Sequence, residues 1–274
     1  MDSALQTKNK NLWQKIHRSP LFDISQYILL VGAIVWFFSN STAQMGYNWQ
    51  WYQIPKSIFT HDETGTTTGP LWDGLMVTFR ISGISLLLAF VIGLATALFR
   101  LSNSFAARII ARVYLETIRN TPLLIQLFFI YFVLGPVLGI SRMASAILAL
   151  SLFEGAYASE IFRAGIVSIR RGQWEAAYSL GLSTFDTYYC IVLPQAIRRI
   201  LPPLTSQAIS LIKDSALVST IAIYDLTMQA QAVIAETFLT FELWFTVAGM
   251  YLAVTVTLSF IVHWMEPVSY THLR

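Results

Sequence analysis

Residues 76–99 read MVTFRISGISLLLAFVIGLATALF, a run in which Arg80 is the one charged side chain. A helix that crosses a lipid bilayer needs about 20 mostly apolar residues. Inside a bilayer, backbone N–H and C=O groups must be paired within the protein, which favours helices over open sheets. The stretch therefore predicts a transmembrane helix, and it sets the fold class of the whole chain.

Five further stretches are long and apolar enough to be read in the same way: 21–40, 122–140, 143–166, 200–223 and 243–264. A membrane barrel would instead show alternating strands of about 10 residues. Of the 274 residues, 55% are hydrophobic and 12% are charged, about half the charge of an ordinary soluble domain. These figures exclude a soluble enzyme and a disordered chain. The single cysteine, Cys190, excludes a disulfide scaffold. We predict an all-α, polytopic transmembrane helical bundle of about six helices, one N-terminal helix plus a five-helix core.

The first stretch is the weakest, because Asp23, Ser25 and Gln26 interrupt it. A cleaved signal peptide is the alternative interpretation, since basic residues precede a short apolar run and small residues follow it at 41–43. In both cases the second helix starts on the outside, so the orientation of the core is the same.

Lysine and arginine predict that orientation, because they are enriched in cytoplasmic loops. With the N-terminus inside, the inner segments hold 13 of the 18 basic residues: Lys8, Lys10, Lys15, Arg18, Arg100, Arg108, Arg112, Arg119, Arg163, Arg170, Arg171, Arg198 and Arg199. The outer loops hold only Lys56 and Arg142. The sequence therefore predicts a multi-pass membrane protein with both termini in the cytoplasm.

Domain boundaries follow from the same pattern. Residues 1–70 comprise the N-terminus, the first helix and an external loop, in which the tract 64–70 is predicted to be flexible. Residues 71–266 form the core, and 267–274 are a tail of doubtful origin, without the basic cluster expected on the inside.

The segment 170–194, RRGQWEAAYSLGLSTFDTYYCIVLP, is too polar to span a membrane and too patterned for an irregular loop. Arg170, Arg171 and Gly172 resemble a helix C-terminus, where cations and a glycine are favoured. A short helix is then expected to start near Gln173 and to end at Gly181.

A second short helix is expected after a bend at Gly181–Ser183. Ser183 suits an N-cap, and Asp186 three residues later completes a capping box. Because the residues before a proline avoid helical geometry, this helix should stop before Pro194.

An apolar, largely aromatic stripe runs along the two helices at helical spacing: Trp174, Tyr178, Leu182, Phe185 and Tyr189. One interpretation packs this stripe against the membrane helices. The small residues Ala176 and Ala177 are better explained by docking into a groove of another protein.

Glu175-Ala176-Ala177, then Gly181, then Ile191-x-Leu193-Pro194 resembles the EAA motif of ABC importer permeases in both residues and spacing. The resemblance implies that Glu175, Ala176, Ala177 and Gly181 form a coupling helix that docks on an ATPase subunit. It also implies that Ile191, Leu193 and Pro194 anchor the return of the chain to the membrane.

Three more segments resemble the polar amino acid subfamily of these permeases: 114–126, 154–163 and 213–217. That subfamily handles histidine, arginine, lysine, glutamine, glutamate and opines. The implied partners are ABC ATPase subunits, a second permease subunit in a homodimer or paralogous heterodimer, an external substrate-binding protein, a polar amino acid and the lipid bilayer. Nucleic acid is not among them. The resemblance also implies that the protein lies in a bacterial inner (plasma) membrane.

Charged residues within membrane helices are costly and therefore candidates for function. Glu154 lies midway along the fourth predicted helix, and Lys213 and Asp214 lie deep in the fifth. An amino acid zwitterion needs both a cation and an anion. Lys213, Asp214 and the Ser215 hydroxyl could line its path with Glu154, or they could pair between helices to fix packing. Gln126, within an apolar run, is a further candidate for the path.

Two pairs at i,i+3 spacing are predicted to be structural ion pairs: Glu160 with Arg163, and Glu116 with Arg119. The four histidines are scattered, so no metal site is expected. No catalytic residues, cofactor or phosphate-binding loop are predicted for this chain, and ATP would be bound by the partner. The alternatives are an ABC permease for another small solute, a stand-alone secondary transporter, and, least favoured, an intramembrane enzyme.

Overall fold

The computed structural model describes residues 20–44, 46–62 and 65–265, in two compact units, Met1–Gln50 and Trp51–Arg274. The basic N-terminal residues Lys8, Lys10, Lys15 and Arg18 and the tail 267–274 lie outside the described residues. Among its described residues, the first unit contains one long helix, α2 (Pro20–Gln44), at the position of the first predicted span.

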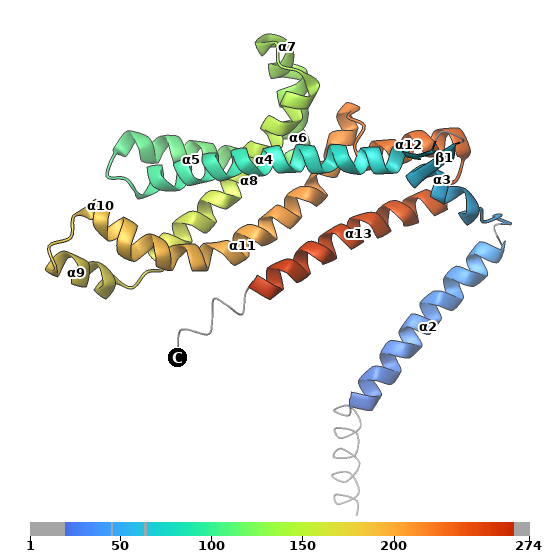
Figure 1. Cartoon of the computed structure of the whole chain (residues 1–274), viewed down its shortest axis with the longest axis horizontal. Coiled ribbons are helices and arrows are strands. Elements are labelled where there is room, and N and C mark those ends of the chain that lie inside the picture. The colour runs from blue at the N-terminus through green and yellow to red at the C-terminus, as the bar shows by residue number, and fades with distance from the viewer. Residues whose placement is uncertain (1–19, 45, 63–64, 266–274) are drawn as a thin grey trace, which may run out of the picture. The chain divides into compact units, whose positions relative to one another are not determined.

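The second unit contains the remaining elements (Figure 1). A short external-loop region comes first, with η1 (Trp51–Gln53), α3 (Ile54–Ile58), β1 (Phe59–Asp62) and β2 (Gly65–Thr68). The helices that follow are α4 (Pro70–Leu101), α5 (Phe105–Arg119), α6 (Leu123–Phe128), η2 (Phe129–Leu134), α7 (Gly135–Leu138), α8 (Arg142–Val167), α9 (Arg171–Ser179), α10 (Thr184–Asp186), η3 (Thr187–Val192), α11 (Leu193–Asp214), η4 (Ser215–Ile221), α12 (Leu226–Thr237) and α13 (Thr240–Met265).

The centre of this unit is the crossing of α4 and α8, which make its most extensive helix contact. Small residues let the two backbones approach closely, as is common in membrane proteins. A Cβ atom built on Gly93 would lie 2.8 Å from the Cβ of Ala158 and 3.0 Å from the carbonyl oxygen of Gly155. Glycine is therefore required here by the spacing of the helices.

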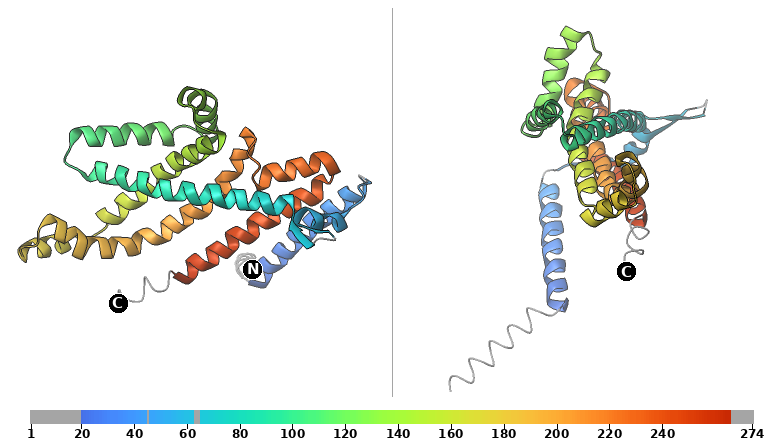
Figure 2. Two further views of the ribbon diagram at one scale, coloured as in Figure 1. Left: turned by 45° about the horizontal axis from the view of Figure 1, so that its top comes forward. Right: turned by 90° about the vertical axis from the view of Figure 1, so that its left-hand side faces the viewer.

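The third predicted span, 122–140, is correct in position but is only part of the structure found there. It is divided into α6, η2 and α7, and α5 precedes it at an angle of 106° (Figure 2). The bend follows from Pro122, which cannot continue a helix from α5 and instead caps α6. Residues 105–119, which form α5, were not among the six predicted spans.

The fifth predicted span, 200–223, belongs to a longer helical path. It begins with α10 and continues through η3 and α11 to the end of η4 at Ile221. Ala222 then adopts a left-handed conformation with φ of 57°, and Asp225 caps the next helix by accepting a hydrogen bond from Met228 N at 2.9 Å. That helix, α12, was not predicted.

The tract 64–70 was predicted to be flexible, and this prediction is wrong for Gly65–Thr68. Those residues form β2, which pairs antiparallel with β1 in a register of Phe59 opposite Thr68. The contacts also group the residues from Trp51 onward with α4 and the helices after it.

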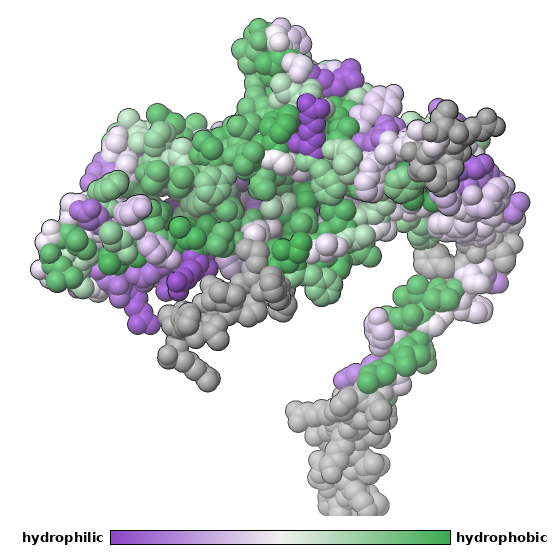
Figure 3. All heavy atoms as spheres, viewed as in Figure 1, coloured by the Kyte–Doolittle hydropathy of each residue, from purple (hydrophilic) through white to green (hydrophobic). Residues whose placement is uncertain are grey.

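Within the described residues, four helices are long and apolar enough to cross a membrane by themselves: α2, α4, α8 and α13. Two bent pairs also qualify, α5 with α6–α7 and α10–η4 with α12, which gives up to six spans. The predicted all-α transmembrane bundle is confirmed. The face of the second unit seen in Figure 3 is largely hydrophobic. Exposed apolar side chains of this unit include Leu87 and Phe260.

Candidate functional site

The segment between α8 and α9 differs from its prediction. Arg171 and Gly172 are the first two residues of α9, so the expectation that they end the preceding helix is wrong. The preceding helix, α8, ends at Val167. The carbonyl of Ser168, which follows this helix, is paired by a side chain of another helix: Arg199 Nη1 of α11 donates to it at 2.7 Å.

The bend at Gly181 has the predicted cause. Gly181 has φ of 76°, a left-handed conformation that glycine adopts readily. Its N–H donates to the Tyr178 carbonyl at 2.9 Å, and the N–H of Leu182 donates to the Ala177 carbonyl at 3.1 Å. These two bonds form a Schellman motif, which ends α9.

Ser183 is the N-cap of α10, as predicted, and its hydroxyl accepts from Asp186 N at 3.1 Å. The same hydroxyl donates to the Asp186 carboxylate at 2.5 Å. The expectation that the second helix stops before Pro194 is wrong. The chain passes from α10 through the π-helical η3 into α11, where Pro194 occupies the first turn and needs no N–H partner.

The predicted stripe divides into two parts. Trp174 packs edge-on against Tyr188 at 5.0 Å between ring centroids, and both join the hydrophobic cluster around α8 and α11. Phe185 and Tyr189 stack on each other but are exposed to solvent, Phe185 by 76%. Leu180, at the end of α9, is 81% exposed. Of the other stripe residues, Leu182 is half-buried and Tyr178 is exposed, so packing against the membrane helices does not explain the whole stripe.

The residues of the EAA-like motif lie along this segment. Glu175 is exposed and pairs with Arg171 at 2.9 Å, Ala176 is exposed, and Ala177 is buried. Ile191 lies in η3, and Leu193 and Pro194 open α11. The motif thus combines an exposed helix, α9, with the helical return of the chain toward the membrane.

A buried carboxylate, Glu154, lies in the middle of α8. Its Oε2 accepts from Gln207 Nε2 of α11 at 2.6 Å, whereas its Oε1 has no hydrogen-bond partner. The two residues line a cavity of about 220 Å³ between α4, α8 and α11. The Asp214 side chain lies close enough to interact with Glu154. Gln207 was not predicted as a site residue, although its i,i+7 spacing to Asp214 places both on one helix face.

The other path candidates do not join this cavity. Lys213 is exposed on α11, and the buried Ser215 donates to the carbonyl of Ile212 at 2.7 Å. Gln126 donates to the carbonyls of Ile118 and Thr121, both at 2.8 Å, and so ties the turn between α5 and α6.

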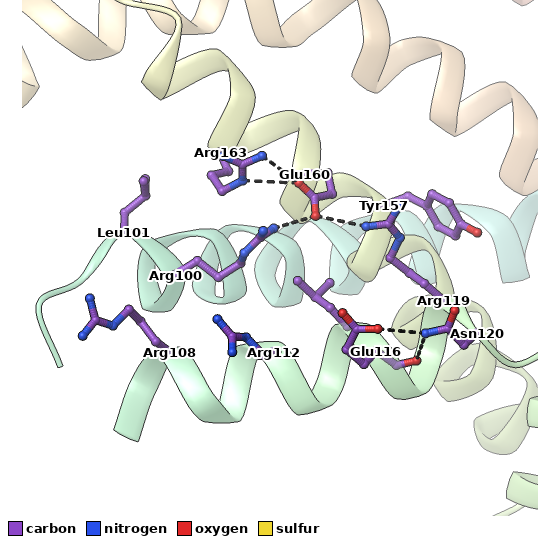
Figure 4. A pocket seen from close by; sticks show the side chains of 11 residues that line it. Arg100, Leu101, Arg108, Arg112, Glu116, Arg119, Asn120, Tyr157, Glu160 and Arg163 are labelled. Atoms are coloured by element: carbon purple, nitrogen blue, oxygen red, sulfur yellow. Dashed lines mark hydrogen bonds and ion pairs between the residues drawn. The ribbon is translucent and has the colours of Figure 1, made fainter. Parts of the chain in front are cut away.

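Glu160 of α8 is the centre of an ion-pair cluster (Figure 4). Its predicted pair with Arg163 is present at 3.2 Å. Two further arginines also bind its carboxylate, Arg100 of α4 at 2.6 Å and Arg119 of α5 at 3.1 Å. Three helices are therefore joined through one carboxylate, which spacing within a single helix could not reveal.

The predicted pair of Glu116 with Arg119 is wrong. Arg119 points to Glu160 and lies over the ring of Tyr157 at 5.8 Å, whereas Glu116 accepts from Asn120 Nδ2 at 2.9 Å. The longer reach to α8 is favoured because the Glu160 carboxylate is only 28% exposed, so that charge interactions there are less screened.

These residues line the largest of the described cavities, about 640 Å³ in volume, which we name the arginine cleft. Its lining residues are Arg100, Leu101, Arg108, Arg112, Leu115, Glu116, Arg119, Asn120, Tyr157, Glu160 and Arg163. They come from α4, α5 and α8 and from the residue that follows α5. Among the described residues, no group of three or more histidine, cysteine, aspartate or glutamate side chains could hold a metal ion.

Comparison with known proteins gives one family. The model described as "Binding-protein-dependent transport system inner membrane component" matches residues 89–268. The probable glutamine ABC transporter permease protein of Bacillus subtilis (strain 168) is 44% identical over 69% of this chain and 88% of its own length. The glutamine transport system permease protein of Escherichia coli (strain K12) is 40% identical over 72% of this chain and 91% of its own length.

Solved structures agree in fold. A chain of an amino acid ABC transporter crystallised with histidines superimposes with a TM-score of 0.68 at 35% sequence identity, covering 72% of this chain and 93% of that one. A chain of the inward-facing MetNI methionine ABC transporter gives a TM-score of 0.63 at 20% identity, covering 73% of this chain and 96% of that one. The second likeness concerns the fold alone.

Proposed function

Because the chain belongs to the family of binding-protein-dependent transport system inner membrane components, we propose that it forms half of the translocation path of an ATP-driven importer for polar amino acids. The chain is a multi-pass membrane permease and a transport component rather than an enzyme. In the proposed assembly, two permease subunits enclose the path and two ATPase subunits bind ATP. An external binding protein delivers the amino acid.

One observation carries the coupling part of this proposal: the exposed apolar side chains between the end of α9 and η3. Leu180, Phe185 and Tyr189 are exposed although the neighbouring Trp174 is packed. A short protruding helix with exposed apolar side chains suits docking into a groove of another protein. The α9–α10 segment is thus proposed to carry movements of the ATPase subunit to α8 and α11.

Gly181→Asp is expected to separate the chain from its ATPase subunit. Aspartate at φ of 76° is strained, and its charge lies between the exposed Leu180 and the start of α10. Co-purification of the tagged chain in mild detergent measures the effect. Wild type is expected to retain the ATPase subunit, and the variant to retain about tenfold less of it.

Gly172→Asp is the matched control, because it adds the same charge to the same segment. Gly172 lies in the first turn of α9 with open space around it, where an acidic residue is favoured. Equal loss in both variants would contradict a specific role for the bend. If folded wild type brings down no ATPase subunit at all, uptake driven by protons or sodium becomes the better interpretation. A second permease in the sample distinguishes a heterodimer from a homodimer.

For the substrate path, we infer that Glu154, Gln207 and Asp214 contact the cargo. The inference is supported by the unpaired Oε1 atom of Glu154 beside a cavity, since buried charges without partners are costly and tend to be functional. Two carboxyl groups favour the ammonium end of an amino acid.

Glu154→Gln is expected to lower the uptake of radiolabelled glutamine by the reconstituted importer at least tenfold, because the substituted side chain carries no negative charge for the ammonium group. Co-purification of the ATPase subunit should not change. Glu236→Gln, the same replacement at an exposed position of α12, is the control. Normal uptake by the Glu154 variant would remove this residue from the path.

The orientation is also part of the proposal. The arginine-rich ends of α4 and α5 and the α9–α10 segment are placed in the cytoplasm, together with both termini, because basic residues favour that side. The β1–β2 hairpin then lies outside, where an external binding protein would dock.

A further inference from the structure

The arginine cleft has a surplus of positive charge. Five arginines and two glutamates line it, which gives a formal charge of +3. The Glu160 carboxylate is already shared by three of the arginines. In the described part of the chain, Arg108 and Arg112 form no ion pair. The cleft therefore has guanidinium groups that are available to an anion from outside the chain.

The arginines of α5 are arranged in one row. Arg108, Arg112 and Arg119 follow each other at spacings of four and seven residues, so their side chains lie within about 40° on the helix surface. Figure 4 shows Arg108 and Arg112 projecting from α5 into the cleft that Arg100 of α4 also lines. A guanidinium presents several N–H donors in one plane, and that geometry matches the oxygens of a phosphate.

An apolar surface lies next to this row. Phe105, Ile109, Ile110 and Val113 of α5 are all exposed, Phe105 by 73%. On the helix they occupy the arc beside the arginines. A soluble anion would use only the arginines. A ligand that uses both surfaces has an anionic head and an apolar tail.

From this juxtaposition we propose that the arginine cleft binds the phosphate group of an anionic phospholipid, with the acyl chains against the exposed apolar face of α5. The volume of about 640 Å³ falls within the usual range of ligand pockets, roughly 300–1,000 Å³. Basic pockets between membrane helices near the cytoplasmic side are suited to lipid headgroups. The proposal rests on the proposed function for the placement of the cleft at the cytoplasmic membrane surface.

The test compares lipids on the tagged chain, purified with whatever subunits accompany it, by native mass spectrometry after incubation with phosphatidylglycerol or phosphatidylcholine. Wild type is expected to retain phosphatidylglycerol about tenfold more strongly than phosphatidylcholine. Arg108→Gln/Arg112→Gln should weaken retention of phosphatidylglycerol about 25-fold, since each basic residue near an anionic lipid contributes about fivefold. Because neither arginine has an ion-pair partner among the described residues, the double variant should unfold at the wild-type temperature.

Lys56→Gln/Arg80→Gln is the matched control, because it removes two positive charges from exposed positions outside the cleft. Equal loss of lipid in the control, or equal retention of both lipids by wild type, overturns the proposal. Displacement of the lipid by millimolar inorganic phosphate would also overturn it, and would assign the cleft to a soluble anion. If the double variant misfolds, each single variant should still show about a fivefold loss. The readout needs no ATPase, so it is independent of the co-purification test.

Discussion

Gly93→Leu should leave little folded protein, because it forces apart the two helices at the centre of the second unit. Even a Cβ atom at this position would overlap the Cβ of Ala158 at 2.8 Å and crowd the carbonyl oxygen of Gly155 at 3.0 Å. Backbone atoms cannot move aside as the end of a flexible side chain can. We expect a loss of about 3 kcal/mol or more, measured as the yield of monodisperse protein in detergent and its thermal unfolding midpoint.

The matched control is Gly83→Leu on the same helix. Gly83 is exposed, and nothing lies within 4 Å of a Cβ atom built there. Helix propensity favours leucine over glycine by up to about 1 kcal/mol. The control should therefore unfold at or above the wild-type temperature. A Gly93 variant as stable as the Gly83 variant would show that α4 and α8 do not pack as closely as described.

Glu160→Gln should destabilise the packing of α4, α5 and α8 around the arginine cleft. The substitution leaves Arg100, Arg119 and Arg163 around a neutral amide, so that three like charges repel each other. These side chains are 26% to 45% exposed, and solvent screening limits the expected loss to about 2 kcal/mol. The measurement is the free energy of unfolding in detergent.

Salt and a second substitution distinguish repulsion from a general packing defect. Raising the ionic strength from about 0.05 to about 0.5 M should recover part of the loss, because exposed charges are then screened over a few ångströms. Adding Arg100→Gln should also recover part of it, because one of the repelling charges is removed. Glu116→Gln, at an exposed carboxylate bonded to Asn120, should cost less than about 0.5 kcal/mol. A loss that neither salt nor Arg100→Gln reduces would contradict the ion-pair cluster.

The transmembrane helices could be predicted from sequence because their signal is local. The run at 76–99 lies within α4, and the stretch at 143–166 is almost the whole of α8. The bend after α9 was predicted for the same reason, since a left-handed glycine and an N-cap serine act within a few residues.

Interactions between helices had no comparable signal. Arg119 had two possible carboxylates, and the nearer one in sequence, Glu116, was the wrong choice because the fold brings Glu160 of α8 beside it. The amide of Gln126 was interpreted as part of a path, but its donors serve the turn that the unpredicted α5 makes with α6. Both errors share one cause: the contacts that α5 makes with α6 and α8 leave no signal in the local sequence.

The π-helical η3 has a mechanical consequence for the second unit. Since η3 replaces the expected break before Pro194, the chain is helical without interruption from Thr184 to Ile221. At about 1.5 Å per residue this helical path is roughly 55 Å long. It starts at the exposed segment on which an ATPase subunit is proposed to dock, and it carries Gln207, which bonds to Glu154. A movement of the docking segment would therefore reach the buried carboxylate through one continuous helical path, in which η3 and the prolines Pro202 and Pro203 are the places where bending is easiest.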